Sequence, residues 1–303
     1  MRSALERLVR EATGLHVLPP LLDAAVSRLE QSTWPEAVTR WSRLTPSGFP
    51  VELTIGGEAL RWTAEAAPPE VADSARLDLA VAILAAHGQA PDPALADALR
   101  HAQAGADLRF GAWIGGRESP ARAGAFRLKL YAEIPPAFPP PGLSAPSSFP
   151  WRLLPYGARA RMLGVEPARG RTEVYVRLPA VDPLALLPFL YATGHGAALG
   201  GVERGLADGL GRLRGRRLGL SVARESDGAT ELALFASART LFPAEPAMLA
   251  ALVRGLGDGG TWRVGLVTLG LDPEGRGLRT TVGISPGMSP RHGRACGATS
   301  VAV

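Results

Sequence analysis

The stretch ARARMLGVEPARGRTEVYVRL, residues 158–178, has the pattern of two β-strands joined by a tight turn. On both sides of the central PARG, apolar residues alternate with polar or charged ones, which is the period of a strand with one buried face. A connection this short joins antiparallel strands, because parallel neighbours need a long crossover, usually helical. The segment therefore predicts a β-hairpin.

Four further pairs of alternating runs occur along the chain, each joined by a turn rich in Gly, Pro or Asp. They are PVELTI with ALRWTAEA, LRFGAWIGG with AFRLKLYAEI, RLGLSVARE with TELALFASA, and WRVGLVTLG with LRTTVGIS. In the second pair the turn is RESPARAG, so Arg117 falls in the turn. The chain thus contains five predicted hairpins.

Stretches rich in Ala and Leu precede most of these hairpins, so the repeating unit is helix–helix–strand–strand. The exception is the hairpin at 158–178, which follows a proline-rich segment, 135–151, that we expect to be irregular. The predicted helices cover residues 3–30, 35–43, 72–87, 92–103, 182–192, 199–213 and 243–256.

The repeats predict an α+β fold in which ten antiparallel strands close into a β-barrel surrounded by α-helices. Closure is favoured because it removes the exposed sheet edges. An open α+β sheet and two smaller domains are the alternatives. We expect residues 1–285 to form a single domain, and residues 286–303, which lack periodicity, to form a flexible C-terminal tail.

The composition narrows the class of protein. The chain has 303 residues, 46% of them hydrophobic, a net charge of +5 and one cysteine, Cys296. These values indicate a globular protein without a disulfide framework. No signal peptide or uninterrupted apolar span occurs, so we expect a cytoplasmic protein that does not bind membranes. The arginines are scattered, which argues against nucleic acid as a partner. We expect a monomer or a weak homodimer.

One face of the second strand in each hairpin is unexpectedly polar. In an open sheet this face would meet solvent, whereas in a closed barrel with helices outside it would line the lumen. Buried cations need partners, and glutamates can neutralise some of them. The surplus would fit a polyanion such as a diphosphate. The glutamates on this face are Glu65, Glu133, Glu173 and Glu231.

These repeats, together with the motifs PVELTI, LRWTAEA, RLKLYAEIP and RTEVYVRLP, resemble the soluble aromatic prenyltransferases with the ABBA barrel fold, also called the PT barrel. The closest likeness is to the dimethylallyltryptophan synthase-like branch, and it spans roughly residues 45–285. The resemblance implies that Glu52 lies beside the acceptor nitrogen. It also implies that Arg61 binds diphosphate, and that Lys129 and Tyr131 supply a diphosphate ligand and a shielding ring.

The chain departs from the family pattern on the last three hairpins. The third hairpin usually carries Arg-x-Lys-x-Tyr, but here it reads Arg171, Glu173, Tyr175. Because Glu173 replaces a cation, Arg177 or Arg127 would have to rebalance the diphosphate site. The fourth hairpin carries Phe235 where a tyrosine is common, and the last hairpin carries Arg279 but no tyrosine.

The resemblance implies metal-independent transfer of a dimethylallyl or longer prenyl group from an allylic diphosphate to an aromatic acceptor, most simply an indole or tryptophan derivative. The protein would then need no cofactor and no metal, since no DDxxD-type motif occurs. Glu52 and Lys129 would act in catalysis. The diphosphate ligands would be Arg61, Lys129, Arg171, Arg177 and Arg279. The carbocation and the acceptor would be surrounded by Tyr131, Tyr175, Phe235 and Trp113.

Lys129 is the only lysine in the chain. Lysine presents a compact point charge, whereas arginine presents a wide planar fork. We therefore expect the Lys129 ammonium to approach a diphosphate oxygen while its stem lies beside the Tyr131 ring.

Other interpretations of these residues remain open from the sequence. Glu52 could be an exposed strand residue, Arg171 and Glu173 could pair on a wet surface, and Trp113 alternates as a core residue would. The acceptor could be a phenol, a phenazine or a peptide side chain. The barrel could also bind a ligand without turnover.

Overall fold

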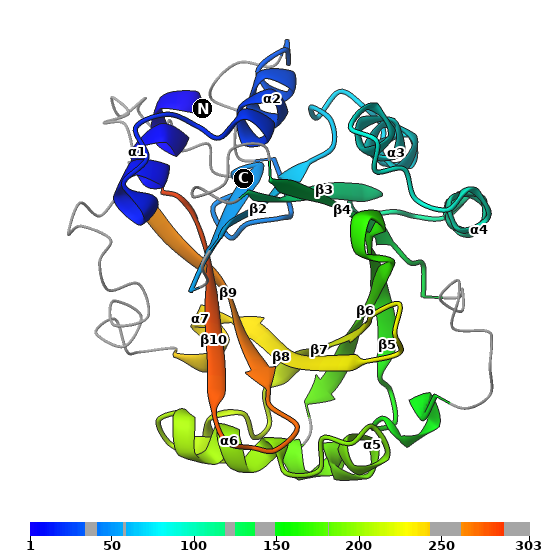
Figure 1. The fold of residues 1–303 in the computed structure, drawn as a ribbon, viewed down its shortest axis with the longest axis vertical. Helices are drawn as coiled ribbons and strands as arrows, with labels where there is room; N and C mark the ends of the chain where they lie inside the picture. Colours follow the sequence, from blue (N-terminus) through cyan, green and yellow to red (C-terminus); the bar gives the residue numbers. More distant parts are fainter. Residues whose placement is uncertain are drawn as a thin grey trace, which may run out of the picture.

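The computed structural model describes residues 1–33, 41–56, 59–118, 125–136, 149–180, 182–242 and 262–287. Ten antiparallel strands close into a barrel in the order β1-β10-β9-β8-β7-β6-β5-β4-β3-β2, as Figure 1 shows in a view through its centre. The strands are β1 (Val51–Ile55), β2 (Leu60–Glu65), β3 (Ala112–Glu118), β4 (Phe126–Glu133), β5 (Arg159–Glu166), β6 (Arg171–Ala180), β7 (Arg217–Arg224), β8 (Thr230–Ser237), β9 (Trp262–Leu271) and β10 (Leu278–Pro286).

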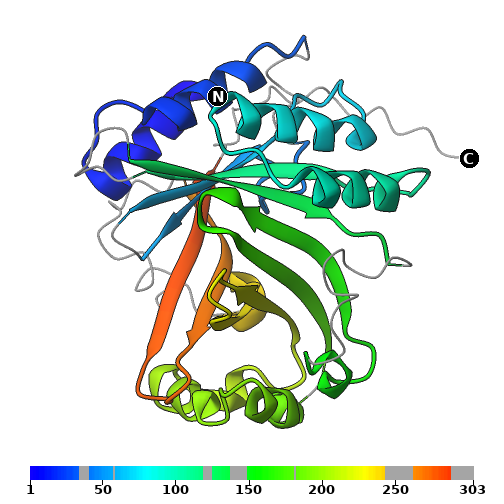
Figure 2. The same cartoon turned by 45° about the vertical axis from the view of Figure 1, so that its right-hand side comes forward.

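Helices pack around the outside of the barrel (Figures 1 and 2). Helix α1 contacts β10, α2 contacts β2 and β3, α3 contacts β3 and β4, and α6 contacts β9 and β10. The α-helices are α1 (Arg2–Thr13), α2 (Pro20–Leu29), α3 (Arg76–Ala86), α4 (Pro93–Gln103), α5 (Leu187–Ala192), α6 (Ala198–Gly205) and α7 (Ala238–Leu241). Short 3₁₀ turns are η2 (Asp73–Ala75), η3 (Trp151–Leu153), η4 (Pro167–Arg169), η5 (Pro183–Leu186) and η6 (Gly209–Arg212). None of the helices in the described ranges is long and apolar enough to cross a membrane.

The predicted ten-stranded barrel with surrounding helices is confirmed. The single helix predicted over residues 3–30 is wrong, because α1 ends at Gly14, which has a φ of 76° in the left-handed region that favours glycine. A new helix, α2, then begins at Pro20. Residues 41–43 are not helical. The remainder of the predicted helix 35–43, the helix 243–256 and the tail from residue 288 onward lie outside the described residues.

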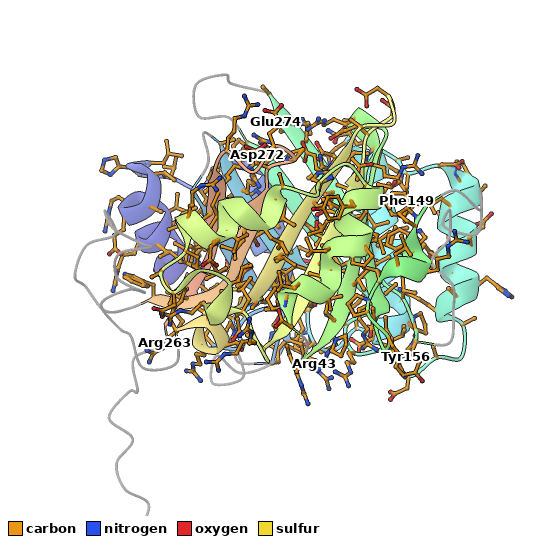
Figure 3. All side chains as sticks on the ribbon, turned by 90° about the horizontal axis from the view of Figure 1, so that it is seen from below. Arg43, Phe149, Tyr156, Arg263, Asp272 and Glu274 are labelled. Atoms are coloured by element: carbon orange, nitrogen blue, oxygen red, sulfur yellow. The ribbon has the colours of Figure 1, made fainter. Side chains whose placement is uncertain are left out.

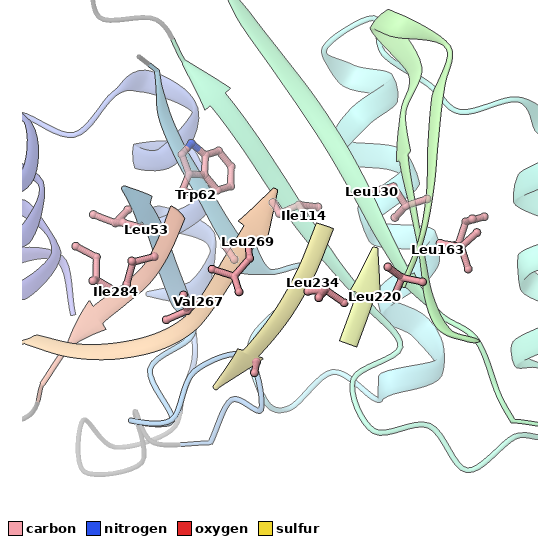
Figure 4. Close-up of a cluster of buried hydrophobic side chains, with 14 of the residues drawn as sticks. Leu53, Trp62, Ile114, Leu130, Leu163, Leu220, Leu234, Val267, Leu269 and Ile284 are labelled. Carbon is pink, nitrogen blue, oxygen red and sulfur yellow. The ribbon is translucent and has the colours of Figure 1, made fainter. Parts of the chain in front are cut away.

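Alternation along the strands produces one apolar and one polar face. The outward-facing side chains are buried beneath the helices, and Figure 4 shows a cluster of them. The cluster includes Leu53, Ile114, Leu130, Leu163, Leu220, Leu234, Val267, Leu269 and Ile284. The intervening residues face the lumen, so the pattern that buries the core also points charged side chains into the barrel.

The two ends of the barrel differ. All five hairpin turns lie at one end, which we call the turn end, because each turn joins an odd-numbered strand to the next even-numbered one. In Figure 3 Asp272 and Glu274, from the β9–β10 turn, lie at the turn end. Arg43, Tyr156 and Arg263 lie at the opposite end. Residues near the turns therefore meet in space although they are far apart in sequence.

Candidate functional site

A cavity of about 430 Å³ occupies the lumen of the barrel and extends toward the turn end. Its lining includes seven basic side chains and four carboxylates, so positive charge is in excess. The basic residues are Arg61, Arg117, Arg127, Lys129, Arg169, Arg171 and Arg279. The carboxylates are Glu52, Glu166, Glu173 and Glu231.

The structure brings nine of the ten candidate site residues to this cavity. They are Glu52, Arg61, Trp113, Lys129, Tyr131, Arg171, Tyr175, Phe235 and Arg279. Arg177 is the exception: it is exposed near the end of β6 and is not among the lining residues. Its position does not support the diphosphate-binding role predicted for it.

At the centre of the cavity, Lys129 is held by groups of the protein itself. Its Nζ forms an ion pair with Glu173 and donates a hydrogen bond to Tyr175 Oη at 3.0 Å. The same Nζ lies 4.9 Å from the ring centroid of Tyr131 and 5.4 Å from that of Tyr175, within cation–π range. The lysine therefore lies beside the Tyr131 ring, as expected, but a carboxylate already neutralises its charge.

Glu173 is saturated with partners. One carboxylate oxygen pairs with Lys129, and the other accepts a hydrogen bond from Ser221 Oγ. Burial alone would raise the pKa of Glu173, but the charge and hydrogen bond of Lys129, with help from Ser221, lower it to about 2. The carboxylate is therefore ionised at neutral pH.

Glu173 does not pair with Arg171 on a wet surface. Arg171 forms ion pairs with Glu225 and with Glu231, the latter at 2.7 Å. The side chain of Arg171 is 13% exposed and that of Glu173 is 11% exposed. Both residues therefore belong to the lumen.

Two of the glutamates expected to neutralise lumen cations have other partners. Glu65 pairs with Arg76 of α3 at 2.5 Å and so ties that helix to the barrel. The Glu133 carboxylate accepts backbone N–H bonds from residues 109–111. That expectation is therefore met by Glu173 and Glu231 and is wrong for Glu65 and Glu133.

Three aromatic rings form a continuous surface on one wall. The rings of Tyr131 and Tyr175 are 5.9 Å apart between centroids, and Tyr175 and Phe235 are also 5.9 Å apart. Glycines on neighbouring strands make room for these side chains. A Cβ on Gly164 would lie 2.5 Å from Lys129 Cε, and one on Gly219 would lie 2.0 Å from the Phe235 ring.

Trp113 is half-buried at the edge of the cavity. It lines the cavity from β3, and its ring stacks on Phe110 with centroids 3.9 Å apart. Stacking on Phe110 therefore restricts the orientation of this ring in the cavity wall.

A row of arginines lies nearer the turn end. Arg61 on β2 is directly opposite Arg117 on β3, and Arg117 is directly opposite Arg127 on β4. We call these three residues the arginine row. Like charges in directly opposite positions destabilise a sheet, because their Cβ atoms are only about 4.5–5.5 Å apart. Burial, followed by the charges of Arg61 and Arg127, lowers the pKa of Arg117.

The arginine row is only partly neutralised. Arg127 pairs with Glu166 at 3.3 Å. Arg61 and Arg117 form no ion pair with any residue in the described part of the chain, and neither does Arg279. The prediction that Arg117 lies in a turn is wrong, because the β3–β4 ladder continues through Arg117 to Glu118.

Glu52 faces the lumen from β1, which lies across the barrel from β6, the strand of Tyr175. It is only 7% exposed, so it is not an exposed strand residue. Two glycines border its carboxylate, since a Cβ on Gly265 would lie 2.3 Å from Oε2 and one on Gly283 would lie 2.5 Å from Cδ. Oε2 is buried without a hydrogen-bond partner among the described residues.

Burial raises the pKa of the Glu52 carboxyl to about 8, and interaction with the backbone of Leu266 offsets this only in part. A carboxyl with a pKa near neutrality can accept and release protons under ordinary conditions, as a general base requires. The Glu52 side chain lines the cavity, whereas its Oε2 is enclosed by the glycines of β9 and β10.

Glu52 and Lys129 lie in the same row of lumen-facing residues, with only small side chains between them. The register places Glu52, Thr63, Gly115 and Lys129 in one row across four strands. At about 4.8 Å per strand, the two ends of this row are ~14 Å apart along the sheet. The intervening side chains are small, so a flat ligand can lie between the carboxylate and the ammonium.

No cluster of three or more His, Cys, Asp or Glu side chains that could hold a metal ion occurs within the described ranges. A second cavity, of about 490 Å³, lies beside the β9–β10 turn. It shares Glu231 and Arg279 with the lumen cavity and also contacts His195.

Several contributors to the site could not be identified from the sequence. Arg117 joins the arginine row, Ser221 completes the partners of Glu173, and Gly265 and Gly283 surround Glu52. The alternation of strand residues indicates which face a side chain occupies. It does not give the cross-strand register that brings these residues together.

Comparison with solved structures identifies the fold as that of the PT-barrel prenyltransferases. The chain matches 6-dimethylallyltryptophan synthase from Micromonospora olivasterospora in complex with DMASPP and Trp, with 18% identity, 94% of this chain and 96% of that chain covered, and a TM-score of 0.59. A 6-dimethylallyl tryptophan synthase matches with 17% identity, coverage of 94% and 96%, and a TM-score of 0.63. The apo form of prenyltransferase PriB matches with 17% identity, 94% coverage of both chains and a TM-score of 0.56.

The sequence itself carries a weaker signal than the structure. No family model matches the chain, and no curated protein sequence matches it. The resemblance inferred from the hairpin motifs is thus confirmed by the fold, over nearly the whole chain.

Proposed function

We propose that this protein transfers a dimethylallyl or longer prenyl group from an allylic diphosphate to an aromatic acceptor, without a metal ion. The observation that carries the proposal is the composition of the lumen cavity. Excess positive charge lies toward the turn end, a surface of three aromatic rings lies on one wall, and the buried carboxyl of Glu52 lies on the opposite wall.

These groups match the three demands of prenyl transfer. The bond between the prenyl C1 and the diphosphate oxygen breaks, and its electron pair leaves with the diphosphate. Cations stabilise that developing charge. The allylic cation is stabilised by the faces of Tyr131, Tyr175 and Phe235, each worth about 0.5–2 kcal/mol. A ring carbon of the acceptor then forms the new bond, and the closed lumen excludes competing water.

Glu52 is the proposed base. Its carboxylate, which lines the cavity, would accept a hydrogen bond from an acceptor N–H or O–H, and this bond increases the electron density of the aromatic ring. Loss of a proton from the alkylated ring carbon would restore the aromaticity of the ring. Glu52 would receive this proton directly or through one water. Both steps require the ionised carboxylate, and with a pKa of about 8 the ionised fraction grows as the pH rises above 7.

We propose an indole or tryptophan derivative as the acceptor. Two structural neighbours are named as dimethylallyltryptophan synthases, and one of them binds Trp together with DMASPP. An indole N–H can donate a hydrogen bond to the Glu52 carboxylate. Metal independence is proposed because arginines and a lysine already supply cationic charge in the cavity.

The test is incubation of the purified protein with dimethylallyl diphosphate and a panel of acceptors, followed by mass spectrometry. The panel contains tryptophan, a tryptophan-containing dipeptide, a phenol and a phenazine, each with EDTA and with added Mg²⁺. A product in which the indole gains one dimethylallyl group in the presence of EDTA is the expected result. Products formed only with Mg²⁺ would contradict metal independence, and products from the phenol or phenazine alone would contradict the indole assignment.

The alternative of a ligand-binding barrel without turnover makes a different prediction. In that case the protein would bind the diphosphates tightly and form no product with any donor or acceptor. The control is Arg177→Gln, because Arg177 is exposed and lies outside the cavity lining. This variant should form product at the wild-type rate.

A further inference from the structure

Lys129 has little capacity left for a ligand. An ammonium group has three N–H donors. One is engaged by Glu173 and a second by Tyr175 Oη at 3.0 Å, while two tyrosine rings lie against the charge. A diphosphate could take only the third donor unless the ion pair broke.

Glu173 also makes this part of the cavity unfavourable for an anion. It remains ionised because its pKa is lowered to about 2. A diphosphate drawn to Lys129 would lie next to this carboxylate and would be repelled by it, and the repulsion is strong where water is excluded. Separating the buried pair would also leave a charge without compensation.

The arginine row has the opposite character. Arg61 and Arg117 form no ion pair within the described ranges, and their mutual repulsion is relieved when an anion binds between them. Guanidinium groups hold phosphate oxygens with paired hydrogen bonds. On β4 the row lies two residues from Lys129 toward the turn end, which corresponds to a displacement of ~7 Å.

We propose that the diphosphate of the donor is held by the arginine row, with Arg117 at its centre, and that Glu173 keeps Lys129 from serving as its ligand. This inference rests on the proposed function and specifies the donor subsite. Lys129, held in its ion pair with Glu173, is then a positioning residue that orients Tyr131 and Tyr175. The reacting C1 lies correspondingly closer to the turn end.

The experiment measures the affinity for inorganic diphosphate by calorimetry, which requires no turnover. The variants are Arg117→Gln, the double variant Lys129→Met with Glu173→Gln, and the exposed control Arg177→Gln. Arg117→Gln should weaken binding at least about tenfold, the loss expected for a charge-assisted hydrogen bond. The control should remain within about twofold of wild type.

The double variant is the discriminating one. It removes both members of the ion pair, so it changes neither the net charge nor the number of buried unpaired charges. Its affinity for diphosphate should stay within about threefold of wild type. A loss of tenfold or more in the double variant, or no loss in Arg117→Gln, would overturn the assignment, as would a wild-type protein that binds no diphosphate.

These outcomes are separable from failure of the proposed function. A protein that binds diphosphate through Arg117 but forms no prenylated product would retain the anion site and lose the transferase activity. Conversely, a product formed with unchanged kinetics by Arg117→Gln would support the transferase and remove the arginine row as the donor subsite.

Discussion

Glu52 and Glu173 lie in the same cavity, are almost equally buried, and are in opposite electrostatic states. Glu173, on the β6 wall, has a lysine and a serine as partners, and its pKa is lowered to about 2. Glu52, on the β1 wall, has an oxygen without a hydrogen-bond partner in the described ranges, and its pKa is raised to about 8. Burial is common to both, so the difference arises from the neighbours.

Glu173 is thus a structural carboxylate that holds neighbouring side chains in place, whereas Glu52 is the carboxyl available for proton transfer. A saturated carboxylate contributes to a fixed arrangement of side chains. An unsatisfied carboxylate costs folding free energy, and such costs concentrate at functional sites. Substitutions at Glu52 and at the Lys129–Glu173 pair test this contrast.

The first prediction concerns Glu52→Gln. The amide has almost the same shape but cannot take a proton, so kcat/KM for prenyl transfer should fall by about 100- to 10,000-fold. The measurement is product formation under initial-rate conditions, with diphosphate affinity as the control, which should be unchanged. Activity near that of the wild type would show that Glu52 is not the base.

The second prediction concerns Lys129→Met, which removes the cation that pairs with the buried Glu173. The free energy of unfolding should fall by about 3–5 kcal/mol, as measured by urea denaturation at pH 7. The double variant with Glu173→Gln should recover most of that loss, because no unpaired charge then remains. Equal losses in the single and double variants would mean that the pair contributes only packing.

The Glu173 ion pair also has a defined dependence on pH. Its folded pKa, about 2, lies below the ordinary value of 4.5, so its contribution to stability is complete above the unfolded pKa. The contribution is lost as the pH falls from about 4.5 toward 2. The double variant lacks this component, and its stability should therefore decline less than that of the wild type over the same interval.

The smallest expected effect is the pH dependence of the rate of prenyl transfer. Because the proposed base, Glu52, would act only when ionised, a pKa of about 8 predicts that kcat/KM rises about tenfold between pH 7 and pH 9. The residual rate of Glu52→Gln should show no such rise. A wild-type profile that is flat over this range would contradict the raised pKa.

The fold was largely predictable from the sequence because its signal is local and repeated. Each hairpin shows a period of two on both sides of a short turn, and five such hairpins imply ten antiparallel strands. The break between α1 and α2 was missed because a single glycine, Gly14, ends the first helix. Its left-handed conformation is a feature of the backbone that apolar periodicity does not reveal.

The site was predictable only as a set of lumen-facing positions. Glu52, Lys129 and Tyr175 were identified from the resemblance and from strand alternation. The pairing of Lys129 with Glu173, and the adjacency of Arg61 to Arg117, depend on register and on side-chain reach across several strands. The burial of the Glu52 carboxyl depends on Gly265 and Gly283, which lie near the other end of the sequence.

The pairing of β1 with β10 has a consequence for biosynthesis. The ribosome makes β1 early and β10 last of all the strands, so the barrel cannot close until β10 has emerged. Before that moment β1 and β9 would both expose open edges that could pair with other chains. Glu52 would also lack its neighbour Gly283. A nascent chain is thus vulnerable to aggregation, and its lumen becomes enclosed in one late step.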